Sequence, residues 1–547
     1  MQSHDGADAV DVVVVGAGFS GLYMLHRLRA LGLSVRAFEA GGGVGGTWFW
    51  NRYPGARCDV ESLEYSYAFS EALQQEWRWS LRYAEQPEIL AYIDHVADRF
   101  DLRRLIQFDT RVVSQHFDEA SGVWIVTTSR DERIAARFCV MATGNLSTPR
   151  VPDFAGLERF QGAWHHSAQW PVDGVDFTGQ RVGLIGTGAT GIQMTPQIAA
   201  QAAHLTVFQR TANFSVPARN AALDDAADRG HKATYAERRR YAIRTSVGIS
   251  GLRLTAPAAA DVSPAERQQA FQTSWDFGGS AYFLTTFSDL MIDEAANQDA
   301  ADFVRARIRD IVDDPAVAEL LCPRDHPIGT KRLCVDTGYY ETFNRPNVTL
   351  ADLRRAPITG ITEHGIRTTE RDHTLDAIVF ATGFDAMTGA LREIDIQGRG
   401  GRALADAWSA GPTTYLGLMV EGFPNLFVVT GPGSPSVKTN MVCSIEQHVE
   451  WIAECLAHLQ AHGIAAIEPE AAAQRDWVAH VNTVADGTLF PRAESWYSGA
   501  NIPGKPRVFM PYVGGIPAYR RICDDVAANG YRGFTLTPAQ PEALRPA

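Results

Sequence analysis

The sequence predicts an α/β fold built on two separate parallel sheets. The first observation is that two glycine-rich turns, GAGFSG (16–21) and GTGATG (186–191), each follow an apolar strand and precede a helical pattern. The second is that two further apolar strands, at 138–144 and 377–383, end in Ala-Thr-Gly. The third is the length of 547 residues, which is too long for a single hydrophobic core.

Composition and charge narrow the class of protein. A hydrophobic content of 45% with 21% charged residues is typical of a folded chain, and the net charge of -13 argues against a nucleic-acid partner. The seven cysteines include no CxxC pair, so we expect neither a disulfide framework nor a metal site. The N-terminal MQSHDGADAV does not resemble a signal peptide, and no apolar run approaches the ~20 residues that span a bilayer. We therefore expect a cytoplasmic protein without a membrane partner, and the oligomeric state stays open, a monomer included.

The first glycine turn has the pattern of a site for the pyrophosphate of a dinucleotide. A strand is expected over Asp11–Val15, a helix up to Gly32, and a second strand that ends in Glu39. Glycines allow a tight turn and a close approach of pyrophosphate to the helix N-terminus, and Glu39 can accept hydrogen bonds from a ribose. A glycine turn without a ligand is the alternative, and the order of strand, turn, helix, strand and acid argues against it. The turn residues assigned to the ligand are Gly16, Gly18, Ser20 and Gly21.

The second glycine turn repeats the pattern with one change. A strand over Val182–Ile185, a helix to about Ala203 and the strand LTVFQR bring Arg210 to the position where an acid is expected. A carboxylate would repel a 2′-phosphate, whereas a guanidinium binds it through paired hydrogen bonds, so Arg210 and Thr211 predict NADPH over NADH. A solvated arginine at a strand end is the alternative.

Two dinucleotide turns in one chain indicate a flavoprotein that a nicotinamide cofactor reduces. The sequence thus predicts two Rossmann-like dinucleotide-binding domains, one for FAD and one for NADPH. The Ala-Thr-Gly strands resemble the returns between domains in proteins of this architecture. Its disulfide-reductase branch needs a redox cysteine pair, which the chain lacks.

The segment FQGAWHHSAQWP (160–171) resembles a family fingerprint, FxGxxxHxxxW(P/D), of the type I Baeyer–Villiger monooxygenases. The residues that match it are Phe160, Gly162, His166, Trp170 and Pro171. The family's second signature is similar to GGTWFWNRYPGARCD (45–59), and the resemblance extends from about Val10 to about Leu536. Segments such as GPGSPS and ESWYSGANIPGKPRVFMPYVGG are most similar to the phenylacetone monooxygenase group.

The resemblance implies a domain division. Residues 1–145 and 384–547 would form a discontinuous FAD domain, the second part carrying an active-site segment, and 146–383 an NADP domain. The stretch of about 221–323, rich in Ala, Arg, Asp and Gln, would be a helical insertion in the NADP domain.

The role of His166 has two interpretations. A general base is one, since an imidazole titrates near neutral pH. A histidine that hydrogen-bonds backbone and fixes the connection between the domains is the other. We favour the structural role, because a linker is a poor place to hold a base against a substrate.

The resemblance also implies a reaction. NADPH reduces FAD, O2 adds at the flavin C4a carbon, and the resulting peroxide attacks a ketone to give a tetrahedral adduct. Arg332, in GTKRL, matches the family's catalytic arginine, and Asp59 matches the acid that orients it through a paired hydrogen bond. A structural ion pair is the alternative for Arg332. Lys331 matches a residue that shares the 2′-phosphate with Arg210 and Thr211.

The remaining contacts are carried over from the same motifs. Trp496, which spacing alone would leave as a core or interface tryptophan, matches an aromatic residue that meets NADP. Further flavin contacts are Thr47, Trp48, Asp59, Tyr65, Val112 and Met441. The NADP contacts are Gly186, Thr187, Gly188, Ala189, Thr190, Gly191, Gln193, Arg210, Thr211, Lys331, Arg332 and Trp496.

One residue departs from the family pattern. Lys438 puts a charge into GPGSPSVKTN (431–440), a loop that shapes the ketone pocket and where small neutral residues are expected. A lysine points to solvent by default; if Lys438 points inward, the preferred ketone differs from an aryl ketone.

The sequence therefore predicts an FAD-dependent monooxygenase that uses NADPH and O2 to convert aryl, cyclic or linear ketones to esters or lactones. Two alternatives stay open. One is a related flavin monooxygenase that oxygenates an amine nitrogen or a sulfide sulfur. The other is a redox sensor that binds both nucleotides without turnover.

Overall fold

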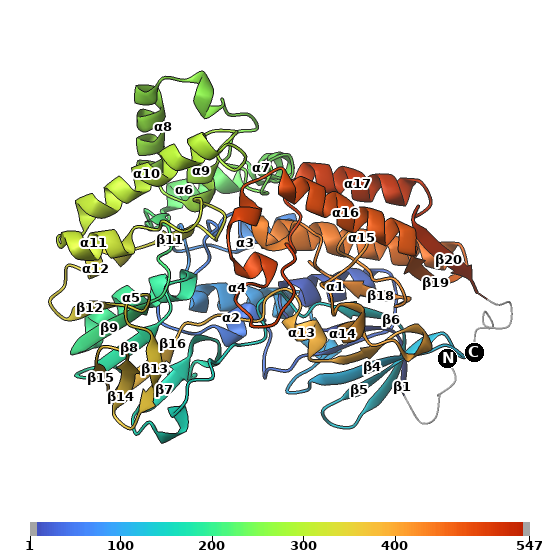
Figure 1. Cartoon of the computed structure of the whole chain (residues 1–547). Coiled ribbons are helices and arrows are strands. Elements are labelled where there is room, and N and C mark those ends of the chain that lie inside the picture. The colour runs from blue at the N-terminus through green and yellow to red at the C-terminus, as the bar shows by residue number, and fades with distance from the viewer. Residues whose placement is uncertain (1–7, 540–547) are drawn as a thin grey trace.

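The computed structural model describes residues 8–539, and Figure 1 shows how its layers are arranged. Two sheets, one mixed and one parallel, lie side by side in the lower half. A group of helices from the middle of the chain stands above one of them, and three long C-terminal helices lie beside that group. The N-terminal segment that argued against a signal peptide falls largely outside the described residues.

The first sheet has the strand order β17-β4-β5-β6-β1-β2-β3, and β18 pairs with β6. Its centre is parallel, because β1 pairs in parallel with both β2 and β6, whereas β4, β5 and β6 form an antiparallel meander. The strands are β1 (Asp8–Val15), β2 (Val35–Phe38), β3 (Ile106–Gln107), β4 (Val112–Asp118), β5 (Val123–Thr128), β6 (Arg133–Met141), β17 (Asp395–Gln397) and β18 (Leu426–Val428). Two strands from beyond residue 384 thus join a sheet that the N-terminal residues begin.

The second sheet is parallel throughout, in the order β12-β9-β8-β16-β7. Its strands are β7 (Ala163–His166), β8 (Arg181–Ile185), β9 (His204–Gln209), β12 (Val348–Asp352) and β16 (Ala377–Phe380). Shorter strands form three small sheets: β10 (Ser215–Pro217) with β11 (Cys334–Asp336), β13 (Ile358–Thr362) with β14 (Gly365–Thr368) and β15 (Asp372–Thr374), and β19 (Ile464–Pro469) with β20 (Phe534–Pro538).

Helices cover the sheets because their apolar faces need a partner. One core cluster joins α1 to α4, α15 and α17 over the first sheet, and a second cluster joins α5 to the insertion helices over the second. The helices outside the insertion are α1 (Phe19–Ala30), α2 (Thr47–Trp50), α3 (Glu71–Glu76), α4 (Gln86–Arg99), α5 (Ala189–Gln201), α12 (Tyr339–Thr342), α13 (Gly389–Arg392), α14 (Leu404–Ala407), α15 (Met441–Ala461), α16 (Ala471–Asp486) and α17 (Ile516–Ala528).

The stretch predicted to be a helical insertion contains helices and no strand among its residues, all of which are described. The helices are α6 (Asp225–Lys232), α7 (Tyr235–Ala242), α8 (Pro264–Phe277), α9 (Ser280–Leu284), α10 (Glu294–Ile311) and α11 (Pro315–Leu321). Both predicted strand–turn–helix–strand units are confirmed, as are the two Ala-Thr-Gly strands, which are β6 and β16. The domain bounds stay a prediction.

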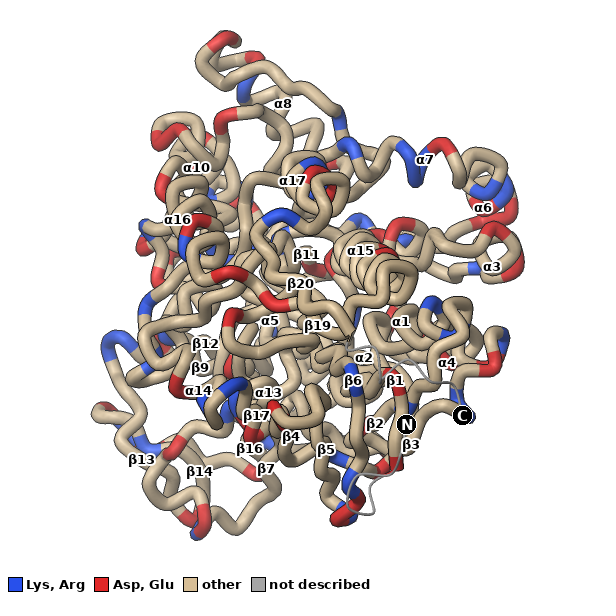
Figure 2. The backbone as a smooth tube through the Cα atoms, turned by 90° about the vertical axis from the view of Figure 1, so that its right-hand side faces the viewer, with Lys and Arg blue, Asp and Glu red and all other residues tan. Residues whose placement is uncertain are grey.

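The outer surface shows mixed charge. Figure 2 shows Lys and Arg alternating with Asp and Glu along the outer helices and loops. Within residues 8–539, no helix combines the length and apolarity needed to cross a membrane, and no cluster of side chains there could hold a metal ion.

Candidate active site

The two glycine turns have the same construction. Gly16 has φ +106° and Gly186 φ +117°, a region that L side chains rarely adopt. A Cβ on Gly16 would lie 2.5 Å from the carbonyl oxygen of Ala142, and one on Gly186 would lie 2.4 Å from that of Ala381. The alanine of each Ala-Thr-Gly segment therefore packs on the first glycine of one turn, so the two turns are held in the same way.

The first turn is built to receive a dinucleotide. Glu39 follows β2 and is buried; its Oε2 accepts a hydrogen bond from the Ala17 amide at 2.8 Å, and its Oε1 accepts one from Gly41 at 2.8 Å. Burial raises the pKa of Glu39, and these two amides oppose that shift. A Cβ on Gly18 would lie 3.3 Å from the Cα of Gly46, so the second signature approaches the turn closely. These features fit a pyrophosphate at the α1 N-terminus with a ribose at Glu39.

The predicted flavin contacts lie in different parts of the structure, some near the first turn and one in a separate core cluster. Thr47 begins α2 and is exposed, whereas Trp48 is buried and donates from Nε1 to the Tyr65 hydroxyl at 3.2 Å. Met441 begins α15 and packs on the cluster that contains Val437 and Tyr497. Val112 begins β4 and packs instead in the core cluster with Trp124.

The second turn exposes positive charge rather than a carboxylate. Gly188 precedes α5, and a Cβ there would meet nothing within 4 Å, so the helix N-terminus is open to a ligand. Thr187 Oγ1 donates to the carbonyl of Thr211 at 2.7 Å, which ties the turn to the segment after β9. Arg210 is exposed there. Burial lowers the pKa of Lys331; the nearby Asp325 carboxylate opposes that shift, and the charge of Arg210 adds to it. A bound anion would relieve this repulsion, so the donors fit a 2′-phosphate.

Both polar atoms of the Gln193 side chain form hydrogen bonds to other residues of the protein. Its amide oxygen accepts from the Tyr53 hydroxyl at 2.9 Å, and its amide nitrogen donates to the carbonyl of Arg57 at 3.0 Å. A Cβ on Gly55 would lie 2.6 Å from the carbonyl oxygen of Gln193. Helix α5 therefore packs directly on the second signature, and this interface joins the two nucleotide turns.

Arg332 and Asp59 meet across that interface. Arg332 Nε donates to Asp59 Oδ2 at 2.6 Å, and Nη1 makes a long contact of 3.5 Å to the carbonyl of Val437. The predicted paired hydrogen bond is wrong, because only Nε reaches the carboxylate and Asp59 Oδ1 is buried without a partner. Although burial alone would lower it, the Asp59 carboxylate raises the pKa of Arg332 above its usual value, so the guanidinium stays charged.

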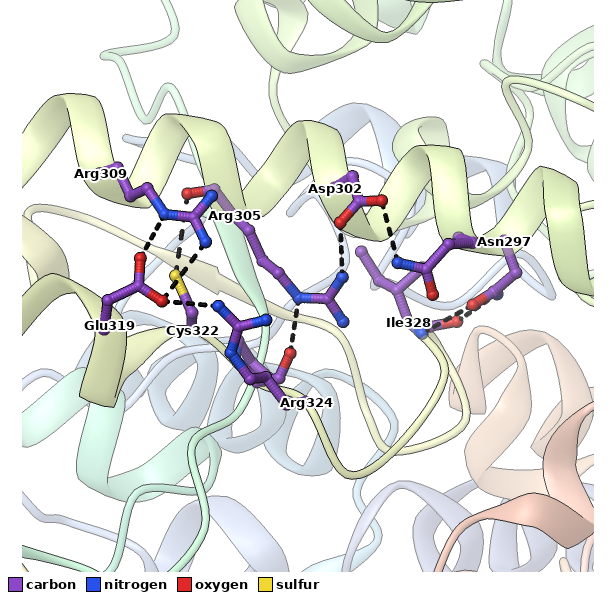
Figure 3. Close-up of polar contacts among 10 residues, drawn as sticks. Asn297, Asp302, Arg305, Arg309, Glu319, Cys322, Arg324 and Ile328 are labelled. Atoms are coloured by element: carbon purple, nitrogen blue, oxygen red, sulfur yellow. Dashed lines mark hydrogen bonds and ion pairs between the residues drawn. The ribbon is translucent and has the colours of Figure 1, made fainter.

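The loop that carries Arg332 is held by the insertion. Figure 3 shows α10 contacting the segment that follows α11. Asn297 is buried; its Nδ2 donates to the Ile328 carbonyl at 2.9 Å, and its Oδ1 accepts from the Ile328 amide at 3.0 Å. Arg305 Nε donates to the carbonyl of Pro323 at 2.7 Å. The insertion thus fixes the backbone a few residues before Lys331 and Arg332.

His166 makes backbone hydrogen bonds, as the structural interpretation predicted. Its Nε2 lies 3.1 Å from the carbonyl of Arg150, and its Nδ1 accepts from the Ala168 amide at 3.2 Å. Burial lowers its pKa, so the ring is neutral. The segment is not a free linker, because His166 ends β7, the edge strand that pairs with β16.

The other fingerprint residues lie around this strand. A Cβ on Gly162 would lie 2.2 Å from the carbonyl oxygen of Asp376, so this glycine allows β7 to approach the neighbouring backbone. Trp170 is buried against Phe177 in the second core cluster, whereas Phe160 is half-buried and Pro171 exposed. These positions indicate packing rather than contact with a reacting group.

Lys438 points inward, contrary to the default for lysine. Its Nζ lies 4.2 Å from the ring centre of Phe490 and 4.6 Å from that of Tyr497. Tyr497 was not among the predicted site residues, although it adjoins Trp496, and their ring centres are 4.3 Å apart. Its position in ESWYSG was the only signal that could have identified it. No sequence signal identifies the backbone contact of Val437 with Arg332.

The fold and this site define an oxidoreductase with two nucleotide sites and a fixed arginine between them. A family model described as flavin-binding monooxygenase-like matches residues 9–221. The chain is 45% identical over 529 residues to a Baeyer–Villiger monooxygenase of Pseudooceanicola batsensis, which covers 96% of each chain. It is 43% identical over 529 residues to the phenazine N-monooxygenase PhzNO1 of Lysobacter antibioticus, covering 96% of this chain and 97% of that one. A solved structure of an oxidized steroid monooxygenase bound to NADP superposes with a TM-score of 0.92 at 54% identity, covering 97% of this chain and all of that one.

The chain belongs to the flavin-binding monooxygenase-like family, among relatives that include Baeyer–Villiger monooxygenases. The predicted family, the α/β fold with two Rossmann-like domains and the enzyme class are thereby confirmed. The individual site residues stay predictions.

Proposed function

We propose that this protein is a Baeyer–Villiger monooxygenase that uses FAD, NADPH and O2 to convert ketones to esters or lactones. The observation that carries the proposal is the Arg332–Asp59 pair at the interface between the two nucleotide turns. When bound, FAD supplies the site at which O2 is activated and NADPH supplies the hydride. We infer that FAD is bound by the domain expected over 1–145 and 384–547, and NADP by the domain expected over 146–383.

Arg332 stabilises the ketone oxygen as it gains negative charge. Asp59 occupies Nε, so the guanidinium is held in one orientation while its Nη2 has no partner among residues 8–539. One-third of the side chain is exposed (34%), so a substrate can reach it. A fixed donor that cannot lose its proton stabilises an oxyanion without acting as an acid.

NADPH is bound by the positive cluster after β9. Arg210 and Lys331 hold the 2′-phosphate, and the open N-terminus of α5 at Gly188 holds the pyrophosphate. The charge repulsion between Arg210 and Lys331 supports this assignment, because an anion between them removes it. The predicted cytoplasmic location, and the absence of nucleic-acid and membrane partners, remain part of the proposal and rest on composition.

A second candidate is oxygenation of an amine nitrogen. The similarity to a phenazine N-monooxygenase favours it, since that relative covers nearly the whole chain. An amine substrate has no carbonyl oxygen that gains negative charge, so its oxygenation does not need a fixed arginine to stabilise such a charge. The Arg332–Asp59 pair therefore favours ketones.

The direct test is oxygenation with isotope-labelled O2. Purified holoenzyme, NADPH and phenylacetone are expected to give benzyl acetate that carries one labelled oxygen. If NADPH is consumed and only hydrogen peroxide forms, phenylacetone is not a substrate. An N-oxide formed from an aromatic amine, without any ester from a panel of ketones, would contradict the proposal.

A further inference from the structure

Lys438 lies in a corner made by two aromatic rings. Phe490 and Tyr497 stand nearly perpendicular, at 86° with their centres 6.3 Å apart, and the Lys438 ammonium lies over both. A cation over two aromatic faces is attracted by both rings, which fixes the side chain in an inward orientation. The side chain is half-buried and lies against the apolar residues around the site.

The Lys438 corner adjoins Arg332. Arg332 Nη1 contacts the carbonyl of Val437, the residue before Lys438. Tyr497 belongs to the same apolar cluster as Val437, with Met441 and Trp496 packed against it. The loop of Lys438 thus reaches the guanidinium that we assign to the ketone oxygen.

Arg332 and Lys438 differ in whether a carboxylate balances their positive charge. Arg332 has the carboxylate of Asp59, whereas Lys438 Nζ has no carboxylate or other hydrogen-bond acceptor in the described part of the chain. Burial, and after it the charge of Arg332, lowers the pKa of Lys438 to about 7. A half-buried charge without a carboxylate partner costs stability, so an apolar side chain of similar length is expected to suit the fold at least as well. No hydrogen bond or ion pair within the described residues requires the positive charge of Lys438.

We propose that Lys438 is a specificity-determining residue that binds a carboxylate on the ketone substrate, so that the preferred substrates are oxo acids. The inference rests on the proposed ketone oxygenation and names its substrate class. The carbonyl oxygen of such a substrate would lie at Arg332, and its carboxylate would lie at the Lys438 ammonium, which the rings of Phe490 and Tyr497 hold in place. The ammonium then gains the acceptor that the protein does not provide.

The experiment compares three ketones of one framework: benzylacetone, para-carboxybenzylacetone and the methyl ester of that acid. For the wild-type holoenzyme, kcat/KM for the acid is expected to exceed that for the ester by about tenfold or more. Lys438→Met is expected to lower kcat/KM for the acid by about tenfold while changing that for the ester by less than about threefold. Its thermal midpoint is expected to stay the same or rise. Arg367→Met, at an exposed arginine paired with Asp372, is the control and should alter none of the three rates.

The outcomes separate the inference from the proposed function. If the wild type oxygenates benzylacetone and the ester but does not favour the acid, the role of Lys438 is overturned and ketone oxygenation stands. If Lys438→Met lowers all three rates equally together with the thermal midpoint, the lysine is a structural brace and the inference is wrong. If the wild type oxygenates no ketone, both proposals fail.

Discussion

The Arg332 guanidinium donates a single hydrogen bond to Asp59, and the second oxygen of that buried carboxylate has no partner. The pair joins elements far apart in the sequence and lies where the second signature meets α5 and the loop after α11. Asp59 is the sole carboxylate that contacts this arginine among residues 8–539, so its short hydrogen bond, with the long contact of Nη1 to the Val437 carbonyl, orients the guanidinium.

Asp59→Ala should therefore impair ketone oxygenation. Without Asp59, Arg332 keeps its charge and loses its orientation, so we expect kcat/KM for a ketone to fall about 100-fold. Steady-state kinetics measures this, with Asp376→Ala as a control because Asp376 forms an exposed pair with Arg181. Equal activity in Asp59→Ala and the control would refute a positioning role for Asp59.

Arg210→Ala should reduce the preference for NADPH. The 2′-phosphate loses one of its cationic partners, so KM for NADPH is expected to rise about 10- to 100-fold, with little change for NADH. Arg181→Ala removes an arginine from the opposite end of β8 and should change neither value. If Arg210→Ala raises both KM values equally, Arg210 does not recognise the 2′-phosphate.

Asn297→Ala should affect stability and catalysis together. Asn297 makes hydrogen bonds to both backbone groups of Ile328 (Figure 3), and their loss in a buried site should cost about 2 kcal/mol of unfolding free energy. The loop of Arg332 then loses its anchor, so kcat for the ketone should fall as well. Asp310→Ala on the same helix is the control, since Asp310 is exposed and pairs with the neighbouring Arg307 at the surface. A loss of stability with unchanged kcat would show that the insertion does not position Arg332.

His448 should make stability depend on pH. It is buried; its Nδ1 accepts from the Thr430 amide at 2.8 Å, its Nε2 lies 2.9 Å from the Tyr519 hydroxyl, and burial lowers its pKa to about 3. The unfolded state takes up a proton near its ordinary pKa of about 6.5 and the folded state does not, so stability is complete above that pH and falls below it. Between about pH 7 and 5 the loss should be about 2 kcal/mol.

Urea unfolding at several pH values measures this dependence. His448→Gln removes the titrating ring, so its free energy of unfolding should vary less between pH 7 and pH 5 than that of the wild type. If the free energy of unfolding changes equally with pH in both proteins, the effect comes from other buried histidines. His166 and His326 are examples, since burial also lowers their pKa values.

The structural features that neighbouring residues form were predictable from the sequence. The glycine turns, their strands and the helical character of the insertion follow from spacing and apolar patterning, because each is made by neighbouring residues. The orientation of Lys438 was not predictable, since it depends on Phe490 and Tyr497 from a distant segment. The single bond between Arg332 and Asp59, and the anchor at Asn297, likewise depend on how separate elements pack.

The central claim is that Arg332 stabilises negative charge on a ketone oxygen, and Arg332→Ala tests it most directly. The measurement compares ester formation from phenylacetone with sulfoxide formation from thioanisole in the same holoenzyme. We predict that ester formation falls about 1000-fold or more while sulfoxide formation stays within about tenfold of the wild type, because a sulfide has no carbonyl oxygen to stabilise. Ester formation that persists in Arg332→Ala, or a loss of both products in equal measure, would contradict the account.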